Sequence, residues 1–220
     1  MNFSALFSDR RRWLIYGALP LSLGLVFVAL YFSSNELAQT LASPALQREF
    51  GLIENAQNLI LLCAIALCWR TARESSSAWA WRAAGLFCLF LLLEEIDWGD
   101  HYRAVLTGLV RPEGEHFNFH NQPGVNRWLK KIVDIGFALF FIVLPLFGSR
   151  LSPRLRALLP DSHSALTLLG GMLVSQLAHS LEDGGAPNNG SLYNNISEFR
   201  ETFTYLVGLY YLSELSRRQS

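Results

Sequence analysis

Residues 85–101 read Gly-Leu-Phe-Cys-Leu-Phe-Leu-Leu-Leu-Glu-Glu-Ile-Asp-Trp-Gly-Asp-His. The apolar run suits the interior of a bilayer, and it ends in two adjacent carboxylates, Glu94 and Glu95. At a helix C-terminus the dipole disfavours anions. Ionisable residues at membrane depth are costly, so they are treated as functional by default. This stretch therefore predicts a transmembrane helix that ends in a functional polar layer.

The composition of the whole chain also indicates a membrane protein. Of its 220 residues, 51% are hydrophobic and 16% are charged, with 18 basic residues against 18 acidic ones. Soluble domains usually carry about 25% charged residues. A net charge of zero gives no electrostatic reason to expect a nucleic-acid partner. The partner that the composition predicts is the lipid bilayer.

Six stretches approach the length of about 20 apolar residues that crosses about 30 Å of hydrocarbon. We therefore predict an all-α fold, a polytopic membrane helical bundle, with residues 1–220 forming a single transmembrane domain. Residues 98–131 would form an outer segment that caps the bundle. The predicted spans are residues 13–33, 51–69, 79–96, 132–148, 165–181 and 196–212.

The distribution of charge predicts the orientation. With the N-terminus in the cytoplasm, 11 of the 18 basic residues fall on the inner side and 14 of the 18 acidic residues fall on the outer side. This is the asymmetry that the positive-inside rule describes. We expect a multi-pass protein of the bacterial cytoplasmic (inner) membrane, with both termini in the cytoplasm.

Small and sulfur-containing residues are interpreted as packing residues. Cys63, Cys68 and Cys88 all fall inside predicted spans, where packing is a better explanation than a disulfide or a metal site. The pair Gly170–Gly171 is typical of close helix contact.

Polar residues gather at the predicted outer ends of four different helices. For the glutamates at helix starts, Glu54, Glu198 and Glu201, the favourable helix dipole is a sufficient structural explanation when each is taken singly. A shared site explains the convergence of all of them. The candidate residues are Glu54, Glu94, Glu95, His101, His179, Glu182, Glu198 and Glu201.

The capping segment adds two histidines, His116 and His120, spaced as metal ligands are on a helix. Pro112 and Gly114 precede them and Pro123-Gly124 follows. These residues disfavour a helix here, so the spacing alone predicts little. The two histidines support a metal site only when they are combined with the carboxylates of the outer layer.

Two motifs resemble a family of uncharacterised bacterial integral membrane proteins. The residues Glu-Glu-Ile-Asp-Trp-Gly-Asp at 94–100 are similar to its Glu-Glu-Ile-Ser-Trp-Gly-Gln signature, and Asn-Phe-His-Asn at 118–121 is similar to its Asn-Leu-His-Asn. The early Arg-Glu-x-Gly-x-x-Glu at 48–54 and a glutamate at 198 fit as well. The resemblance implies that Glu54, Glu94, Glu95, Trp98, His120, Asn121 and Glu198 belong to one site. It implies no reaction, and Asp97 and Asp100 depart from the signature.

Short stretches are also similar to alkaline ceramidases and related membrane hydrolases, which combine a zinc-bound water with carboxylates in a helical bundle. Asp97-Trp98 and residues 196–199 carry this likeness, but the order of the motifs and the histidine spacing differ. We treat it as an analogy.

The leading hypothesis is a metal-dependent enzyme at the outer membrane boundary that acts on a lipid or lipid-linked substrate. Zinc, iron or manganese would suit a mixed carboxylate and imidazole site, either as a membrane hydrolase or as a di-metal oxidase. Glu94, Glu95, His120 and His179 are the predicted metal ligands. Glu54, Glu95 and Glu198 are the predicted catalytic residues, and the supporting residues are Trp98, His101, His116, Asn121, Glu182 and Glu201.

The alternatives belong to other classes of protein. One is a transporter coupled to protons or cations, and another is a non-catalytic membrane accessory protein whose acidic residues pair with arginines. The inner halves of the predicted spans look strongly apolar in sequence. That pattern favours a site with access from one side only.

Overall fold

The computed structural model describes residues 9–32, 52–108, 125–147, 150–184 and 197–219. This part of the chain consists of helices and turns, without strands, so the predicted all-α class is confirmed. Helices α5 (Leu52–Glu74), α6 (Ala78–Glu95), α11 (Ser164–Asp183) and α12 (Ser197–Gln219) are the longest. They correspond to four of the six predicted spans.

The first predicted span is a continuous helical segment from Arg10 to Tyr31. It is made of α2 (Arg10–Trp13), a π-helical stretch η1 (Leu14–Ala18) and α3 (Leu19–Tyr31). Pro20 lacks the N–H that would bond to the carbonyl of Tyr16 four residues earlier. Thr167 Oγ1 of α11 donates to that carbonyl instead, over 2.6 Å. The proline therefore explains both the irregular stretch and a direct link to a neighbouring helix.

The fourth predicted span begins earlier than the sequence indicates. Helix α8 starts at Val125 and runs to Phe137, and η3 (Ala138–Val143) and α9 (Leu144–Leu146) continue it. Residues 125–131 of the expected cap are therefore the first turns of the helix that continues into the fourth predicted span. The start of the expected cap, residues 97–107, forms the short helices η2 (Asp97–Gly99) and α7 (Asp100–Thr107).

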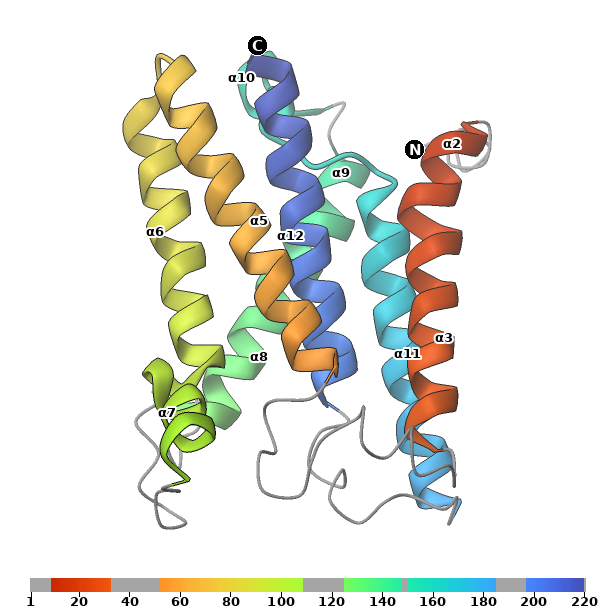
Figure 1. The fold of residues 1–220 in the computed structure, drawn as a ribbon. Helices are drawn as coiled ribbons and strands as arrows, with labels where there is room; N and C mark the ends of the chain where they lie inside the picture. Colours follow the sequence, from red (N-terminus) through yellow and green to blue (C-terminus); the bar gives the residue numbers. More distant parts are fainter. Residues whose placement is uncertain (1–8, 33–51, 109–124, 148–149, 185–196, 220) are drawn as a thin grey trace.

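The long helices form a row in the order α6, α5, α12, α11 and α3, each packed against the next. The α8–η3–α9 segment lies behind this row (Figure 1) and contributes Phe141 to a core shared with Leu168 and Val207. The short helix α10 (Pro153–Ala157) lies at the end where α12 finishes. Helix α12 is central because it contacts both α5 and α11.

Large apolar side chains are exposed on the outer faces of these helices, whereas several polar side chains are buried between them. Gln57, Ser164 and Thr167 are 0% exposed, and Leu59 is 62% exposed. Extended exposed apolar surface of this kind marks contact with another protein or with a membrane. The exposed apolar residues include Leu19, Leu23, Val26, Leu62, Leu86, Phe87, Ile132, Ile135, Leu139, Leu169 and Leu173.

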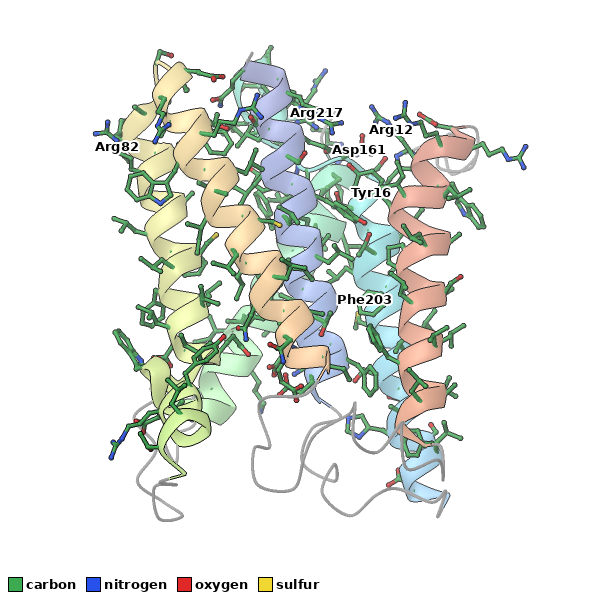
Figure 2. All side chains as sticks on the ribbon, in the orientation of Figure 1. Arg12, Tyr16, Arg82, Asp161, Phe203 and Arg217 are labelled. Atoms are coloured by element: carbon green, nitrogen blue, oxygen red, sulfur yellow. The ribbon has the colours of Figure 1, made fainter. Side chains whose placement is uncertain are left out.

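Two helical stretches of the described chain, Arg10–Leu30 and Ser164–Leu181, are long and apolar enough to cross a membrane. The other long helices carry more polar residues within their length, such as Asn58 in α5 and Arg82 in α6. The number of spans therefore stays a prediction. Figure 2 shows Arg12, Arg82 and Arg217 at one end of the bundle, which is the end predicted to face the cytoplasm.

That end, here called the inner end, contains a polar network that the sequence did not predict. Tyr16 is buried and its hydroxyl donates to Glu214 of α12. Arg12 pairs with Asp161, whose carboxylate also contacts His163 Nδ1 at 2.6 Å. The expectation of strongly apolar inner halves is therefore wrong for α12 and for the segment that begins at Arg10.

Phe203 of α12 packs into a notch formed by two glycines. A Cβ added to Gly24 of α3 would lie 2.8 Å from the ring of Phe203, and one added to Gly171 of α11 would overlap Phe203 Cβ. At Gly170 the same addition would meet the ring at 3.7 Å, which is ordinary contact. The predicted packing role of the glycine pair is thus confirmed, and Gly171 is the member that requires it.

The substitution Gly171→Ala should lower the free energy of unfolding by about 1–3 kcal/mol, because overpacking forces the helices apart. Gly170→Ala is the matched control and should be neutral or slightly stabilising, because alanine favours a helix by about 1 kcal/mol over glycine. Thermal unfolding in detergent measures both. Equal effects of the two substitutions would contradict this account of the notch.

The Asp161 carboxylate should make stability depend on pH. Burial acts to raise its pKa, but hydrogen bonds from His163 and the charge of Arg12 outweigh burial and hold the pKa below its usual value of 3.8. A lowered pKa in the folded state stabilises the fold above the unfolded-state pKa, and this contribution is lost as the pH falls through the folded-state value.

Between pH 5 and about pH 3, we expect the melting temperature of the wild type to fall more steeply than that of Asp161→Asn. Asp183→Asn, which changes an exposed carboxylate at the far end of α11, is the control and should keep the wild-type slope. Parallel curves for wild type and Asp161→Asn would show that the carboxylate does not stabilise the fold.

Candidate functional site

Three carboxylates converge at the end of the bundle opposite the arginines, here called the outer end. Glu95 is the last residue of α6, and Glu198 and Glu201 lie in the first turns of α12. One oxygen from each lies within 4.8 Å of one from each of the others, and all three side chains are partly buried. We call these three residues the carboxylate trio.

The helical periodicity of α12 places four polar side chains of the site on one face of this helix. Glu198, Glu201, Thr202 and Tyr205 are three, four and seven residues apart, so they lie on one helix face. The hydroxyl of Tyr205 donates to Glu95 of α6. This hydrogen bond links α12 directly to the trio member on α6.

Gln57 of α5 adds a third helix to the site. Its side chain is 0% exposed. Its Nε2 donates to Glu198 Oε2 at 2.9 Å and to Thr202 Oγ1 at 3.0 Å. Its Oε1 is buried without a hydrogen-bond partner among the described residues. A buried amide oxygen without a partner is costly, and this one belongs to a side chain in direct contact with the trio.

Glu94 is directed elsewhere, into the turn that follows α6. Trp98 Nε1 donates to Glu94 Oε1 at 2.7 Å, and the Trp98 ring meets Phe90 edge-on. Asp97 and Trp98 have φ values of 49° and 54°. Non-glycine residues in this region cost about 1–3 kcal/mol each and occur where other contacts hold them. Glu94 and Phe90 thus anchor a strained turn that begins α7.

The three carboxylates of the trio repel one another when they are charged. At 4.8 Å or less, each pair of charged carboxylates repels by at least about 3 kcal/mol at an effective dielectric constant of about 20. Such groups cannot all stay ionised unless a cation or shared protons compensate. Glu54 is 4% exposed and lies within electrostatic range of Glu198, so its negative charge adds to the repulsion.

The structure brings together some of the predicted site residues and separates others. Glu95, Glu198 and Glu201 meet, with Glu54 close by. His179 of α11 is exposed and is not a member of the trio's cluster. His101 lies in α7 and Glu182 in α11. The predicted residues His116, His120 and Asn121 lie outside the described residues.

Gln57, Thr202 and Tyr205 were not among the predicted site residues. The available signal was spacing, because Gln57 follows Glu54 by three residues and Tyr205 follows Glu198 by seven. An amide, a hydroxyl and a phenol on the face that carries the glutamates would have indicated a polar surface facing other helices.

No protein-family model, curated protein or solved structure matches this chain. The resemblance to a bacterial membrane protein family stays a prediction from the two motifs. The site is therefore interpreted from its own geometry: three carboxylates, one buried amide and one phenol, gathered from α5, α6 and α12 at one end of the bundle.

Proposed function

We propose that this chain is a multi-pass protein of the bacterial inner membrane whose carboxylate trio binds a divalent metal ion at the outer boundary. The metal would serve the hydrolysis of a lipid or lipid-linked substrate. The observation that carries the proposal is the approach of Glu95, Glu198 and Glu201 to within 4.8 Å, in contact with the buried amide of Gln57.

The membrane location is supported by the distribution of apolar surface. Exposed leucine, isoleucine and phenylalanine side chains follow the outer faces of α3, α5, α6, α8 and α11. Lipid tails would cover such faces, and water would not. The buried polar residues between the helices fit the same interpretation, because ionisable groups in membrane proteins face the bundle interior. We propose six spans, with both termini in the cytoplasm.

A divalent ion would resolve the repulsion within the trio. Hard oxygen donors such as carboxylates and amide carbonyls favour magnesium, calcium and manganese. Of the metals suggested by the sequence, manganese therefore suits the described donors best, and a histidine ligand would shift the preference toward zinc or iron. Glu95, Glu198 and Glu201 would hold the ion, and the amide of Gln57 would orient Glu198 through its Nε2.

The chain's own residues would supply orientation and proton handling. The amide of Gln57 orients Glu198, because its Nε2 donates to Glu198 Oε2 and is itself held by Thr202 Oγ1. Tyr205 donates to Glu95 and can hold or return a proton there. A metal in this site would lower the pKa of a bound water, which is the usual source of the nucleophile in metal-dependent hydrolysis.

A proton-coupled transporter is the second candidate, and one observation favours it. Helix α12 carries hydrogen-bonded polar groups near both ends: Glu198 with Gln57 at the outer end and Glu214 with Tyr16 at the inner end. A polar path along one helix is what a proton relay needs.

The protein purified in detergent without chelator should contain about one divalent metal ion per chain. Glu95→Gln and Glu198→Gln should each reduce the metal content at least tenfold, because each removes a charged ligand. Elemental analysis of the purified protein measures this. Glu74→Gln, which changes an exposed glutamate at the inner end of α5, is the control and should leave the metal content unchanged.

Absence of metal from the wild type, both as purified and after incubation with manganese, iron and zinc, would overturn the metal proposal. So would equal metal content in Glu198→Gln and Glu74→Gln, because the trio would then have no part in binding.

The transporter alternative predicts proton flux into proteoliposomes that Glu54→Gln abolishes, since Glu54 is a buried carboxylate of α5 within electrostatic range of Glu198. The enzyme proposal predicts that vesicles with wild-type protein stay as tight to protons as protein-free vesicles. A pH-sensitive dye inside the vesicles distinguishes the two results.

A further inference from the structure

The helical segment α8–η3–α9 carries an aromatic ring paired with a cation near each of its ends. At the outer end, Lys131 Nζ lies 5.6 Å from the centre of the exposed Trp128 ring. At the inner end, the guanidinium carbon of Arg150 lies 5.6 Å from the centre of the exposed Phe147 ring. Aromatic rings and the charged ends of long basic side chains are typical of the two boundaries of a membrane. Figure 1 shows this segment running between the two ends of the bundle.

The spacing of the two aromatic rings matches the thickness of a bilayer. Trp128 and Phe147 are nineteen residues apart, which corresponds to about 28 Å of helix at about 1.5 Å per residue. The hydrocarbon core of a bilayer is about 30 Å thick. Between the rings, one face of the segment carries the exposed apolar residues Ile132, Ile135 and Leu139. The two rings therefore mark the levels at which the membrane boundaries cross the bundle.

The carboxylate trio lies inward of the outer boundary. Arg200 of α12 donates to Asp134 of α8 at 3.1 Å, and it lies between Glu198 and Glu201 in the sequence. Asp134 follows Trp128 by six residues, or about 9 Å along the helix. This hydrogen bond therefore places the first turns of α12 deeper in the bundle than the Trp128 ring.

Helix α6 gives the same order of residues across the boundary. Trp98 is exposed and follows Glu95 by three residues, in the turn beyond the end of the helix. Phe87 and Phe90 are exposed on the inward side of Glu95. On both α6 and α8, an exposed tryptophan thus lies on the outer side of the trio and exposed apolar side chains lie on its inner side.

This depth distinguishes the parts of a lipid that the trio can reach. Tryptophan rings lie at the level of the lipid headgroups, so a site deeper than the rings faces the acyl carbonyls and the chains below them. Charge gives the same result. One divalent ion would leave the three carboxylates with a net negative charge, which repels a phosphate and not a neutral acyl carbonyl.

We propose that the outer boundary of the bilayer passes through Trp98 and Trp128, and that the bond hydrolysed at the trio is an acyl ester of an outer-leaflet phospholipid. The inference rests on the proposed function and narrows its substrate. In this reaction the oxygen of water joins the acyl carbon, and the bond from that carbon to the alcohol oxygen breaks. A proton of the water passes to the alcohol oxygen, so the products are a fatty acid and a lysophospholipid.

Tryptophan fluorescence in vesicles of brominated phosphatidylcholine tests the depth without any metal. Bromine near the headgroup end of the acyl chains should remove about a fifth less fluorescence intensity from Trp128→Phe than from the wild type, because Trp128 is one of five exposed tryptophans among the described residues. Trp81→Phe, which removes a buried tryptophan, is the control and should lose as much intensity as the wild type.

Equal losses in the wild type and Trp128→Phe would overturn the proposed boundary. It would also be overturned if bromine at the chain ends quenched the Trp128 contribution more than bromine near the headgroups, since the ring would then lie deep in the bilayer.

Product analysis tests the substrate. Manganese-loaded protein in vesicles of phosphatidylethanolamine and phosphatidylglycerol should release fatty acid and lysophospholipid, detected by mass spectrometry. Glu198→Gln should release at least tenfold less, because it removes a ligand of the proposed ion. Glu74→Gln is the control and should keep the wild-type rate.

The outcomes separate this inference from the proposed function. Diacylglycerol as the product would overturn the acyl assignment and leave the metal-dependent hydrolase in place. Bound metal with neither product would contradict both the acyl assignment and the hydrolysis. Absence of metal would overturn the proposed function and the acyl assignment with it, whereas the quenching measurement would still decide the position of the boundary.

Discussion

Repulsion within the carboxylate trio is the constraint on which the rest of this structure depends. Glu95, Glu198 and Glu201 are brought within 4.8 Å by the packing of α6, α5 and α12. Phe203 of α12 packs into the glycine notch between α11 and α3. This contact fixes the position of α12 along its axis relative to those two helices. The fold therefore imposes a charge conflict that only a cation or shared protons can relieve. We propose that a metal ion relieves it.

Helix α12 connects two polar regions of different character. At the outer end it presents glutamates, with Gln57 and Tyr205 as donors. At the inner end, Glu214 accepts hydrogen bonds from Tyr16 and Arg218, and the arginine also donates to the carbonyl of Leu159. The outer region is acidic and gathers oxygen ligands, whereas at the inner end arginines pair with carboxylates, as Arg12 does with Asp161 and Arg218 with Glu214. This division matches the separation of charge that the sequence predicts across a membrane.

Much of the helical layout could be predicted from the sequence, because long apolar runs determine where helices form. Predicted spans such as residues 79–96 and 165–181 agree with α6 and α11 to within about two residues. The start of α8 at Val125 was not predicted, because its first turns are amphipathic and carry Lys130 and Lys131. Hydropathy detects the apolar part of such a helix and misses its polar beginning.

The site was predicted in part, for a similar reason. The glutamates could be assigned to one end of the bundle from the alternating direction of the spans, but their mutual contacts depend on how each helix is rotated. Glu94 and Glu95 are adjacent in sequence, yet one anchors Trp98 and the other joins the trio. The pairing of Tyr16 with Glu214 joins residues 198 positions apart. No local pattern encodes contacts of that kind.

The protonation state of the trio tests the central claim most directly. Infrared difference spectroscopy of the purified protein, before and after removal of metal with a chelator, detects protonated carboxyl groups by their carbonyl stretch. With metal bound, the proposal predicts ionised carboxylates, and a protonated carboxyl band that appears on chelation in the wild type and weakens in Glu198→Gln. A protonated band already present at full strength and insensitive to chelator would contradict it, because protons would then neutralise the trio.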